Sequence, residues 1–219
     1  MDPNVIVTVS GGGSSVGVKS VSEQSAGIGM ASREIRDSEI AECPEIVIHT
    51  IARDGIAIVT SHDVDVTDIT LEEARGIFAE EITDWAEVGG TPGLVTIVSR
   101  EEGSGTRSAF EDIVMDESLI GANAILQPSN GAVRTTVAST PGSIAYISFG
   151  YLDERTVPMA IDGALPTTEN VADGSYPVVR PLNMVTYGEP EGKIAKWLQF
   201  IVSEDGQAVV AAEGYLPVN

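Results

Sequence analysis

Basic residues are scarce in this chain of 219 residues, and lysine is the scarcest of them. The sequence has 12 basic and 33 acidic residues, a formal net charge of −21, and only three lysines (Lys19, Lys193 and Lys196). A charge of this sign and size repels nucleic acids and anionic membrane surfaces, so we exclude both as partners. Aromatic residues make up only 5%. Few aromatics and many carboxylates favour a protein from a halophile, with an ordinary acidic protein from a mesophile as the alternative.

Cysteine and histidine are nearly absent. Cys43 is the only cysteine, which excludes an intrachain disulfide and a thiolate metal cluster, and we expect it to be a small packed residue. The two histidines, His49 and His62, do not have the spacing of a metal-binding pair. We therefore expect no metal and no cofactor. No apolar run approaches the roughly 18 residues of a membrane span, and no signal-peptide pattern opens the sequence.

Strand patterns alternate with helical patterns along the chain, which predicts an α/β fold of one or two domains. The clearest helix begins after Thr70, because Thr70 and Glu73 form a capping box ahead of an apolar face. Near the C-terminus, Ile194, Trp197, Leu198 and Ile201 form a second apolar face that we expect in the core, and Ser203 caps a last short helix. Residues 153–180 have an irregular pattern. The predicted strands are 5–9, 46–52, 56–60, 94–98, 144–149 and 182–187.

Residues 100–107, Arg-Glu-Glu-Gly-Ser-Gly-Thr-Arg, predict an anion site at the start of a helix. Backbone N–H groups after Gly103 have no intrahelical acceptor, and the helix dipole places partial positive charge there. Ser104 and Thr106 add hydroxyl donors, and Arg100 adds a guanidinium fork. A plain N-cap beside a surface arginine is the alternative for this octapeptide taken alone.

A second Gly/Ser segment, residues 7–19, runs from a strand pattern through Gly11–Gly13 into a helical pattern. It fails as a P-loop, because Val18 stands where that motif needs lysine. It also fails as a dinucleotide fingerprint, because Val16 stands where the third glycine belongs. Both failures disfavour a nucleotide as the ligand, and Ser14 or Ser15 is a candidate N-cap or ligand donor.

A third segment, Ile28-Gly-Met-Ala-Ser-Arg-Glu-Ile, ends a short apolar pattern with Ser32 and Arg33. Taken with Gly-Ser-Ile-Ala-Tyr-Ile-Ser-Phe-Gly-Tyr at 142–151 and the final Gly-Tyr-Leu-Pro-Val, the segments resemble, in order, the extracytoplasmic phosphate-binding proteins of phosphate ABC importers. The resemblance covers essentially the whole chain. It implies a two-lobed periplasmic-binding-protein-like fold of type II with two crossover strands, near 56–59 and 183–186. Lobe I would then comprise 1–59 and 183–219, and lobe II 60–182.

The resemblance also implies the site and the function. Ser14, Ser15, Ser32 and Arg33 of lobe I would face Arg100, Ser104, Gly105 and Thr106 of lobe II across a phosphate. The protein would be a non-catalytic receptor that delivers inorganic phosphate to membrane ABC permease subunits. We expect it outside the cytoplasm, anchored to the membrane in its full-length form. A serine enzyme using Ser104 is disfavoured, because Glu102 replaces the first glycine of the nucleophile elbow and histidines are few.

Two departures from the family pattern bear on this interpretation. Some members carry aspartate at the position of Arg33, where it accepts a hydrogen bond from protonated phosphate and rejects sulfate. Arg33 either binds the anion or pairs with Glu34 or Glu39, and receptors for sulfate, tungstate or molybdate remain alternatives. Members also have a further strand, a Ser/Thr ligand loop and a helix before the point matching Asn4. Without them we expect weak phosphate binding and an unpaired sheet edge open to homodimerisation.

Overall fold

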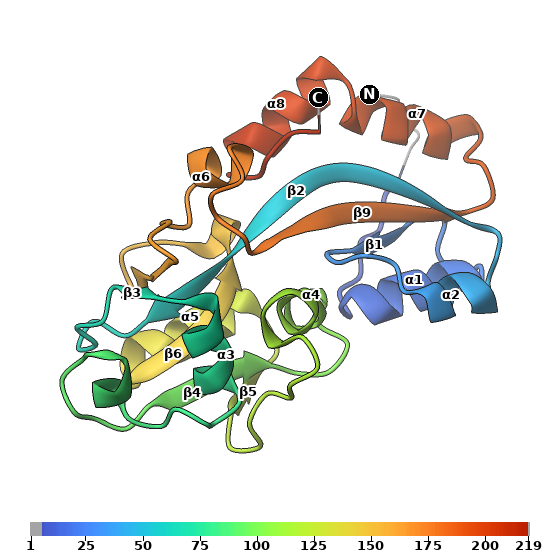
Figure 1. The fold of residues 1–219 in the computed structure, drawn as a ribbon. Coiled ribbons are helices and arrows are strands. Elements are labelled where there is room, and N and C mark those ends of the chain that lie inside the picture. The colour runs from blue at the N-terminus through green and yellow to red at the C-terminus, as the bar shows by residue number, and fades with distance from the viewer. Residues whose placement is uncertain (1–5, 219) are drawn as a thin grey trace.

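Two long strands, β2 (Ile46–Thr60) and β9 (Val179–Tyr187), run side by side through the computed structural model, which describes residues 6–218 (Figure 1). They belong to a sheet of order β1-β9-β2-β6-β4-β5, and β7 (Val157–Pro158) also pairs with β2. A small parallel pair, β3 (Asp68–Ile69) with β8 (Ala160–Ile161), lies apart. The other strands are β1 (Gly29–Ala31), β4 (Thr96–Arg100), β5 (Ile125–Gln127) and β6 (Ser143–Ser148).

Strand β2 changes its partners midway. Residues 46–55 pair antiparallel with β9, whereas residues 56–60 pair antiparallel with β6. This change divides the described chain into a first half, residues 6–55 and 179–218, and a second half, residues 56–178. The chain therefore passes between the halves near Gly55 on β2 and near Val179, with which Gly55 pairs.

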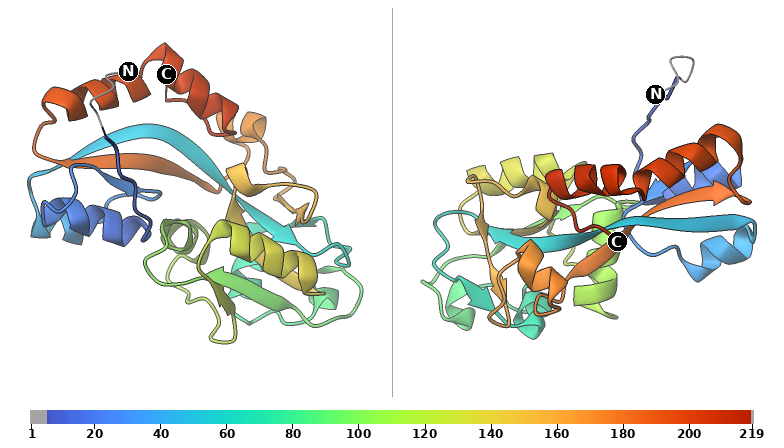
Figure 2. Two further views of the ribbon diagram at one scale, coloured as in Figure 1. Left: turned by 180° about the vertical axis from the view of Figure 1, so that it is seen from behind. Right: turned by 90° about the horizontal axis from the view of Figure 1, so that it is seen from above.

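Helices cover both faces of the sheet in the first half. The helices α7 (Gly192–Ile201) and α8 (Glu204–Ala212) lie over one face of β2 and β9, and α1 (Ser14–Ser22) and α2 (Asp37–Glu42) lie on the other side (Figures 1 and 2). The core of this half is small. Its buried members are Val18, Val21, Ala31, Ile35 and Val185.

The second half has a much larger core around stacked aromatic rings. Phe110 and Tyr146 stack with ring centroids 4.0 Å apart, and Phe78 meets Phe110 edge-on. Packing of this kind fixes the helix that carries Phe110 against the sheet. The helical elements here are α3 (Leu71–Phe78), η1 (Trp85–Val88), α4 (Gly105–Phe110) continuing as the π-helix η2 (Glu111–Met115), α5 (Asn130–Ser139), η3 (Phe149–Tyr151) and α6 (Thr168–Ala172).

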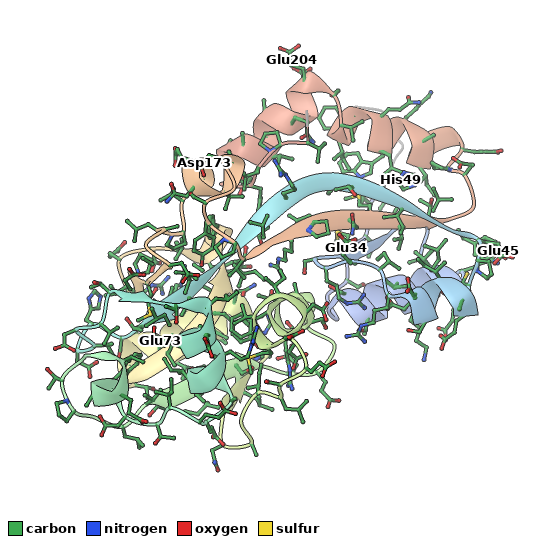
Figure 3. The ribbon with its side chains drawn as sticks, viewed as in Figure 1. Glu34, Glu45, His49, Glu73, Asp173 and Glu204 are labelled. Atoms are coloured by element: carbon green, nitrogen blue, oxygen red, sulfur yellow. The ribbon has the colours of Figure 1, made fainter. Side chains whose placement is uncertain are left out.

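Most of the predicted elements are present. The α/β prediction is confirmed, Thr70 and Glu73 form the capping box of α3, and Ser203 caps α8. Cys43 is buried, as expected. Acidic side chains lie around the outside of both halves, as Glu45, Glu73, Asp173 and Glu204 illustrate (Figure 3).

Two predictions from periodicity were wrong. Residues 6–9 form no strand, because no described strand pairs with their backbone, and Val5 lies outside the described residues. The predicted strands 46–52 and 56–60 are both present, and residues 53–55 join them into the single strand β2. Trp197 is 39% exposed on α7 instead of lying in the core, although Leu198 and Ile201 of the same face are buried.

Candidate functional site

A polar cavity of about 260 Å³ is lined by residues of both halves. Leu182 is the one aliphatic residue in its lining, so the cavity suits a small ligand that forms hydrogen bonds rather than an apolar one. Its lining residues are Gly13, Ser14, Ser32, Asp54, Arg100, Ser104, Gly105, Thr106, Asn130, Ser148, Tyr151, Arg180, Leu182 and Tyr215.

Helix α4 presents its N-terminus to the cavity. After β4 the chain turns at Gly103, whose φ of 82° favours glycine, and Ser104 becomes the N-cap by accepting a hydrogen bond from the Arg107 amide at 3.3 Å. The amides of Gly105 and Thr106 stand in the first turn, where a helix has no acceptor for them. They are available to an anion, and the helix dipole adds to that attraction.

Helices α1 and α5 also begin at this cavity. The N-cap of α1 is Gly13, which offers no side chain to the first-turn amides, and Ser14 Oγ accepts a hydrogen bond from the Ser32 amide at 3.0 Å. In α5, Ser129 caps the Ala132 amide, and Asn130 lines the cavity. Three helix N-termini therefore surround one space, which is a strongly anion-attracting arrangement.

Arg100 and Arg180 bring positive charge into the lining. Arg100 donates from Nε to the Gln127 carbonyl oxygen (3.1 Å) and from Nη2 to the Pro128 carbonyl oxygen (3.2 Å) and to Glu101 Oε1 (3.1 Å). Its Nη1 takes part in none of these bonds. Arg180 donates to Asp54 Oδ2 from Nε (3.0 Å) and Nη2 (2.7 Å), and from Nη1 to the Ser32 carbonyl oxygen (3.0 Å). The lining thus holds two cations and one carboxylate in a molecule of charge −21.

The two halves touch directly beside the cavity. A Cβ atom added to Gly105 of the second half would overlap Ser14 Oγ of the first half and lie 2.5 Å from Ser32 Oγ. Arg36 Nη2 donates to Ser108 Oγ at 3.0 Å, again from the first half to the second. These contacts join the two halves beside the cavity.

Six of the residues chosen from the sequence line this cavity: Ser14, Ser32, Arg100, Ser104, Gly105 and Thr106. Ser15 and Arg33 are not among its lining residues. Arg33 is fully buried and forms a bidentate ion pair with Glu39, at 2.7 and 2.8 Å, and Ser15 Oγ accepts from Arg33 Nη2 at 3.3 Å. Of the two roles left open for Arg33, the structure therefore contains the ion pair.

The ion pair with Arg33 also lowers the pKa of the Glu39 carboxyl group. Burial alone would raise the pKa of Glu39, but hydrogen bonds from Arg33 and from the Arg36 amide lower it below its ordinary value. Glu39 is therefore ionised at neutral pH and accepts both hydrogen bonds of the Arg33 guanidinium. This pair holds Arg33 next to Ser32, which lines the cavity.

Asp54 and Arg180 are the charged lining residues that sequence reasoning missed. Asp54 stands in the middle of a strand whose following residues are apolar and buried, and a carboxylate there is a usable sign of a functional group. Its partner follows 126 residues later in the chain. No spacing rule connects two residues so far apart.

Residues 6–218 contain no group of three or more His, Cys, Asp or Glu side chains arranged to hold a metal ion. Within the same residues, no helix is long and apolar enough to cross a membrane. The donors at the cavity are amides, hydroxyls and guanidinium groups.

Donors of this kind, set between two halves that share crossing strands, define a binding protein for a small oxyanion. The family model described as PBP superfamily domain matches residues 2–205. The phosphate-binding protein PstS of Bacillus subtilis is 35% identical over 220 residues, which are 100% of this chain and 73% of the relative. The chain belongs to the PstS family of phosphate-binding proteins.

Solved structures agree with this membership and with the predicted fold. A Clostridium perfringens phosphate ABC transporter substrate-binding protein with bound phosphate is 37% identical, with a TM-score of 0.88 over 94% of this chain and 85% of that one. An ABC-type phosphate transport receptor from Vibrio cholerae is 31% identical, with a TM-score of 0.83 over 98% and 89%. The periplasmic-binding-protein-like fold of type II is therefore confirmed, in a family of substrate-binding proteins rather than enzymes.

Proposed function

We propose that the protein binds inorganic phosphate in the cavity between its halves and delivers it to an ABC permease. The observation that carries this proposal is the meeting of three helix N-termini with Arg100 around one polar cavity. A phosphate dianion is costly to desolvate, and a site of many fixed donors offsets that cost. Membership in a family whose relatives are named for phosphate adds support.

Titration calorimetry on protein stripped of bound anions tests this function. We expect phosphate to bind with one site per chain, and sulfate, tungstate and molybdate to bind much more weakly. A protein that takes up sulfate, tungstate or molybdate more tightly than phosphate would instead be a receptor for that oxyanion, which is the second candidate function. Absence of phosphate binding in the calorimeter would refute the proposal.

We propose that the two halves are lobes that close upon the ligand. The exchange of partners along β2 supports lobe boundaries near residues 55 and 179, a few residues earlier than the boundaries at 59 and 183 expected from the sequence. One ligand that satisfies donors on both lobes stabilises the closed arrangement. The bond between Arg36 and Ser108 then forms part of the closed state.

The surroundings of the protein are part of the proposal. A charge of −21 and few lysines support a halophilic source, where concentrated salt screens repulsion between carboxylates. We propose that the protein acts outside the cytoplasm and is held at the membrane by an anchor in its full-length form. There it would meet its permease subunits.

The free edge of β1 supports one further proposal. Strand β1 pairs with β9 on one side only, since it is the terminal strand of the sheet order among the described residues. We propose that this edge accepts another strand, from an N-terminal extension or, without one, from a second copy in a homodimer. Light scattering with and without such an extension tests this, and a monomer in both forms would contradict the homodimer.

A further inference from the structure

A short segment after α8, residues 214–218, returns to β2 beside the point where the chain passes between the halves. Leu216 and Arg53 exchange two backbone hydrogen bonds, in which the Arg53 amide donates at 2.8 Å and the Leu216 amide at 2.9 Å. The Val218 amide donates to Oε1 of Gln207, a buried residue of α8, at 2.8 Å. The segment is therefore anchored to the first half at both a strand and a helix.

The segment lies on the edge of β2 that β6 occupies further along. In the sheet order β9 and β6 flank β2 on opposite sides, and Arg53 is paired with β9 on one of them. Leu216 therefore pairs with Arg53 on the other side. From Ile56 onward that side of β2 pairs with β6, beginning at Ser148. The segment and the end of β6 thus lie end to end along one edge of β2, on either side of Gly55.

Two side chains of the segment contact the second half. Leu216 is 5% exposed and belongs to the buried cluster that forms the core of that half. Tyr215 lies over the end of β6, since a Cβ atom added to Gly150 would lie 2.9 Å from the Tyr215 hydroxyl oxygen. Burial raises the pKa of this hydroxyl above its ordinary value, and a hydrogen bond with Ser148 partly offsets the rise. A segment anchored in the first half is thereby attached to the second.

These contacts depend on the angle between the halves. Tyr215 and Ser148 line the cavity from opposite halves, so a motion that opens the cavity about Gly55 moves them apart. The same motion would pull Leu216 from the core of the second half or break its bonds with Arg53. Contacts that are complete only in the closed arrangement shift the population of molecules toward it.

We propose that residues 214–218 form a strap across the hinge, a third connection between the halves beside β2 and β9, which favours the closed arrangement through Tyr215 and Leu216. The inference rests on the proposed phosphate function, because closure of the halves retains phosphate in the cavity. Leu216 is not among the residues that line the cavity. It is therefore a positioning residue, which acts on binding through the placement of the halves.

Three substitutions weaken the strap in different ways. Tyr215→Phe removes the hydroxyl, Gly150→Ala displaces it from the opposite half, and Leu216→Ala shortens the side chain in the core. Calorimetry should give each variant a phosphate affinity about threefold or more below that of the parent, since a contact of the closed arrangement is lost. Tyr187→Phe is the matched control, because Tyr187 is 43% exposed at the end of β9 and outside the cavity lining. Its affinity should equal that of the parent.

Small-angle X-ray scattering supplies the measurement that a merely structural role would not change. The ligand-free variants should have a larger radius of gyration than the ligand-free parent, because fewer of their molecules are closed. With saturating phosphate, all of them should reach the radius of the phosphate-bound parent. If Leu216→Ala does not fold, Leu216→Val makes a smaller change at the same position and takes the same measurements.

Equal radii for the ligand-free parent and the ligand-free variants would overturn the strap, whatever their affinities. A loss of affinity confined to Tyr215→Phe would overturn it too, since Tyr215 would then act as a direct contact with the ligand. A parent that binds no phosphate would overturn the proposed function instead. The radii of the ligand-free proteins would still decide whether residues 214–218 favour the closed arrangement.

Discussion

Arg36 of the first half and Ser108 of the second are joined by a hydrogen bond of 3.0 Å between Nη2 and Oγ. Arg36 is the N-cap of α2, and Ser108 is buried on α4, the helix whose N-terminus faces the cavity. The bond therefore links the anion-facing helix to the opposite half, beside the cavity rather than inside it. It is placed to stabilise the closed state without contacting the ligand.

Removing this bond should shorten the lifetime of the complex. Ser108→Ala deletes one hydrogen bond from a charged donor, worth about 1 to 2 kcal/mol in the closed state. We expect phosphate to dissociate several times faster, with little change in association, in stopped-flow measurements. Ser139→Ala removes a serine that bonds only within α5 and is the matched control. Slower association with unchanged dissociation would contradict a closing role.

Gly105→Ala should separate stability from binding. Gly105 is the first residue of α4, where the preference for alanine of about 1 kcal/mol in a helix interior does not fully apply, so the melting temperature of the ligand-free protein should change little. The added Cβ would overlap Ser14 Oγ and crowd Ser32 Oγ, so both hydroxyls must turn away or the halves must part. We expect at least a tenfold loss of phosphate affinity by calorimetry.

The matched control for Gly105 is Gly131→Ala in the first turn of α5. There an added Cβ meets Ser129 Oγ and Tyr151 Cε1 at 3.9 Å each, which is ordinary contact. Its affinity should equal that of the parent. If Gly105→Ala bound phosphate as tightly as Gly131→Ala and the parent, phosphate binding would not require the close contact between Gly105 and Ser14.

Arg100→Ala should lower phosphate affinity by about 2 to 4 kcal/mol, because a buried anion loses a charge-assisted partner. Ser104→Ala should cost about 1 to 2 kcal/mol as one hydroxyl donor, and it should also lower the melting temperature because Ser104 caps α4. Calorimetry measures both, with Arg155→Ala as the control, since Arg155 pairs with Asp153 outside the cavity lining. If Arg100→Ala bound phosphate as tightly as the parent, the phosphate site would not be the cavity that Arg100 lines.

Neutral salt should raise the stability of the folded protein and the rate at which phosphate associates with it. With a charge of −21, carboxylates repel one another and the molecule repels its anionic ligand, and the Debye length shrinks to about 3 Å at 1 M salt. As potassium chloride rises from low concentration to 1 M, the melting temperature should increase. The association rate constant for phosphate, measured by stopped flow, should increase over the same range. A steady fall of the melting temperature with salt would contradict adaptation to concentrated salt.

Stability should fall at alkaline pH through Tyr146. Burial raises the pKa of its hydroxyl from 10.0 to about 12. Because the folded state holds this proton when the unfolded chain has lost it, the contribution is complete below pH 10 and is lost as pH rises toward about 12. A shift of this size corresponds to a loss on the order of 3 kcal/mol.

Urea unfolding at several alkaline pH values measures how steeply the free energy of unfolding falls with pH. Tyr176 adds to this fall, since burial raises the pKa of its hydroxyl as well. Tyr146→Phe removes the ionising group and should flatten the curve between pH 10 and 12. It also loses the bond between Tyr146 and Ser99, so its stability at neutral pH should be lower. A slope as steep in the variant as in the parent would show that Tyr146 contributes nothing to it.

The sequence was sufficient for features that are local in the chain. Thr70 with Glu73, and the segment from Gly103 to Thr106, create their caps and free amides within a few residues, so the pattern predicts them directly. The placement of residues 6–9 could not be predicted this way. A strand exists only where a neighbour supplies hydrogen bonds, and alternating valines carry no information about that neighbour.

The parts of the site that sequence reasoning missed depend on distant residues. Asp54 and Arg180 become partners because β2 and β9 run antiparallel in one register, in which the two residues are directly paired. Arg33 is adjacent to Ser32 in sequence, yet its guanidinium is taken up by Glu39 on α2. Proximity in the chain to a ligand donor therefore did not predict contact with the ligand.

A crystal structure of the protein grown with phosphate tests the central claim most directly. We expect one tetrahedral anion in the cavity between the halves, within hydrogen-bond distance of Arg100, of Ser104 and of the Gly105 and Thr106 amides. Phosphate bound elsewhere on the molecule, with this cavity holding only water, would contradict the proposed site.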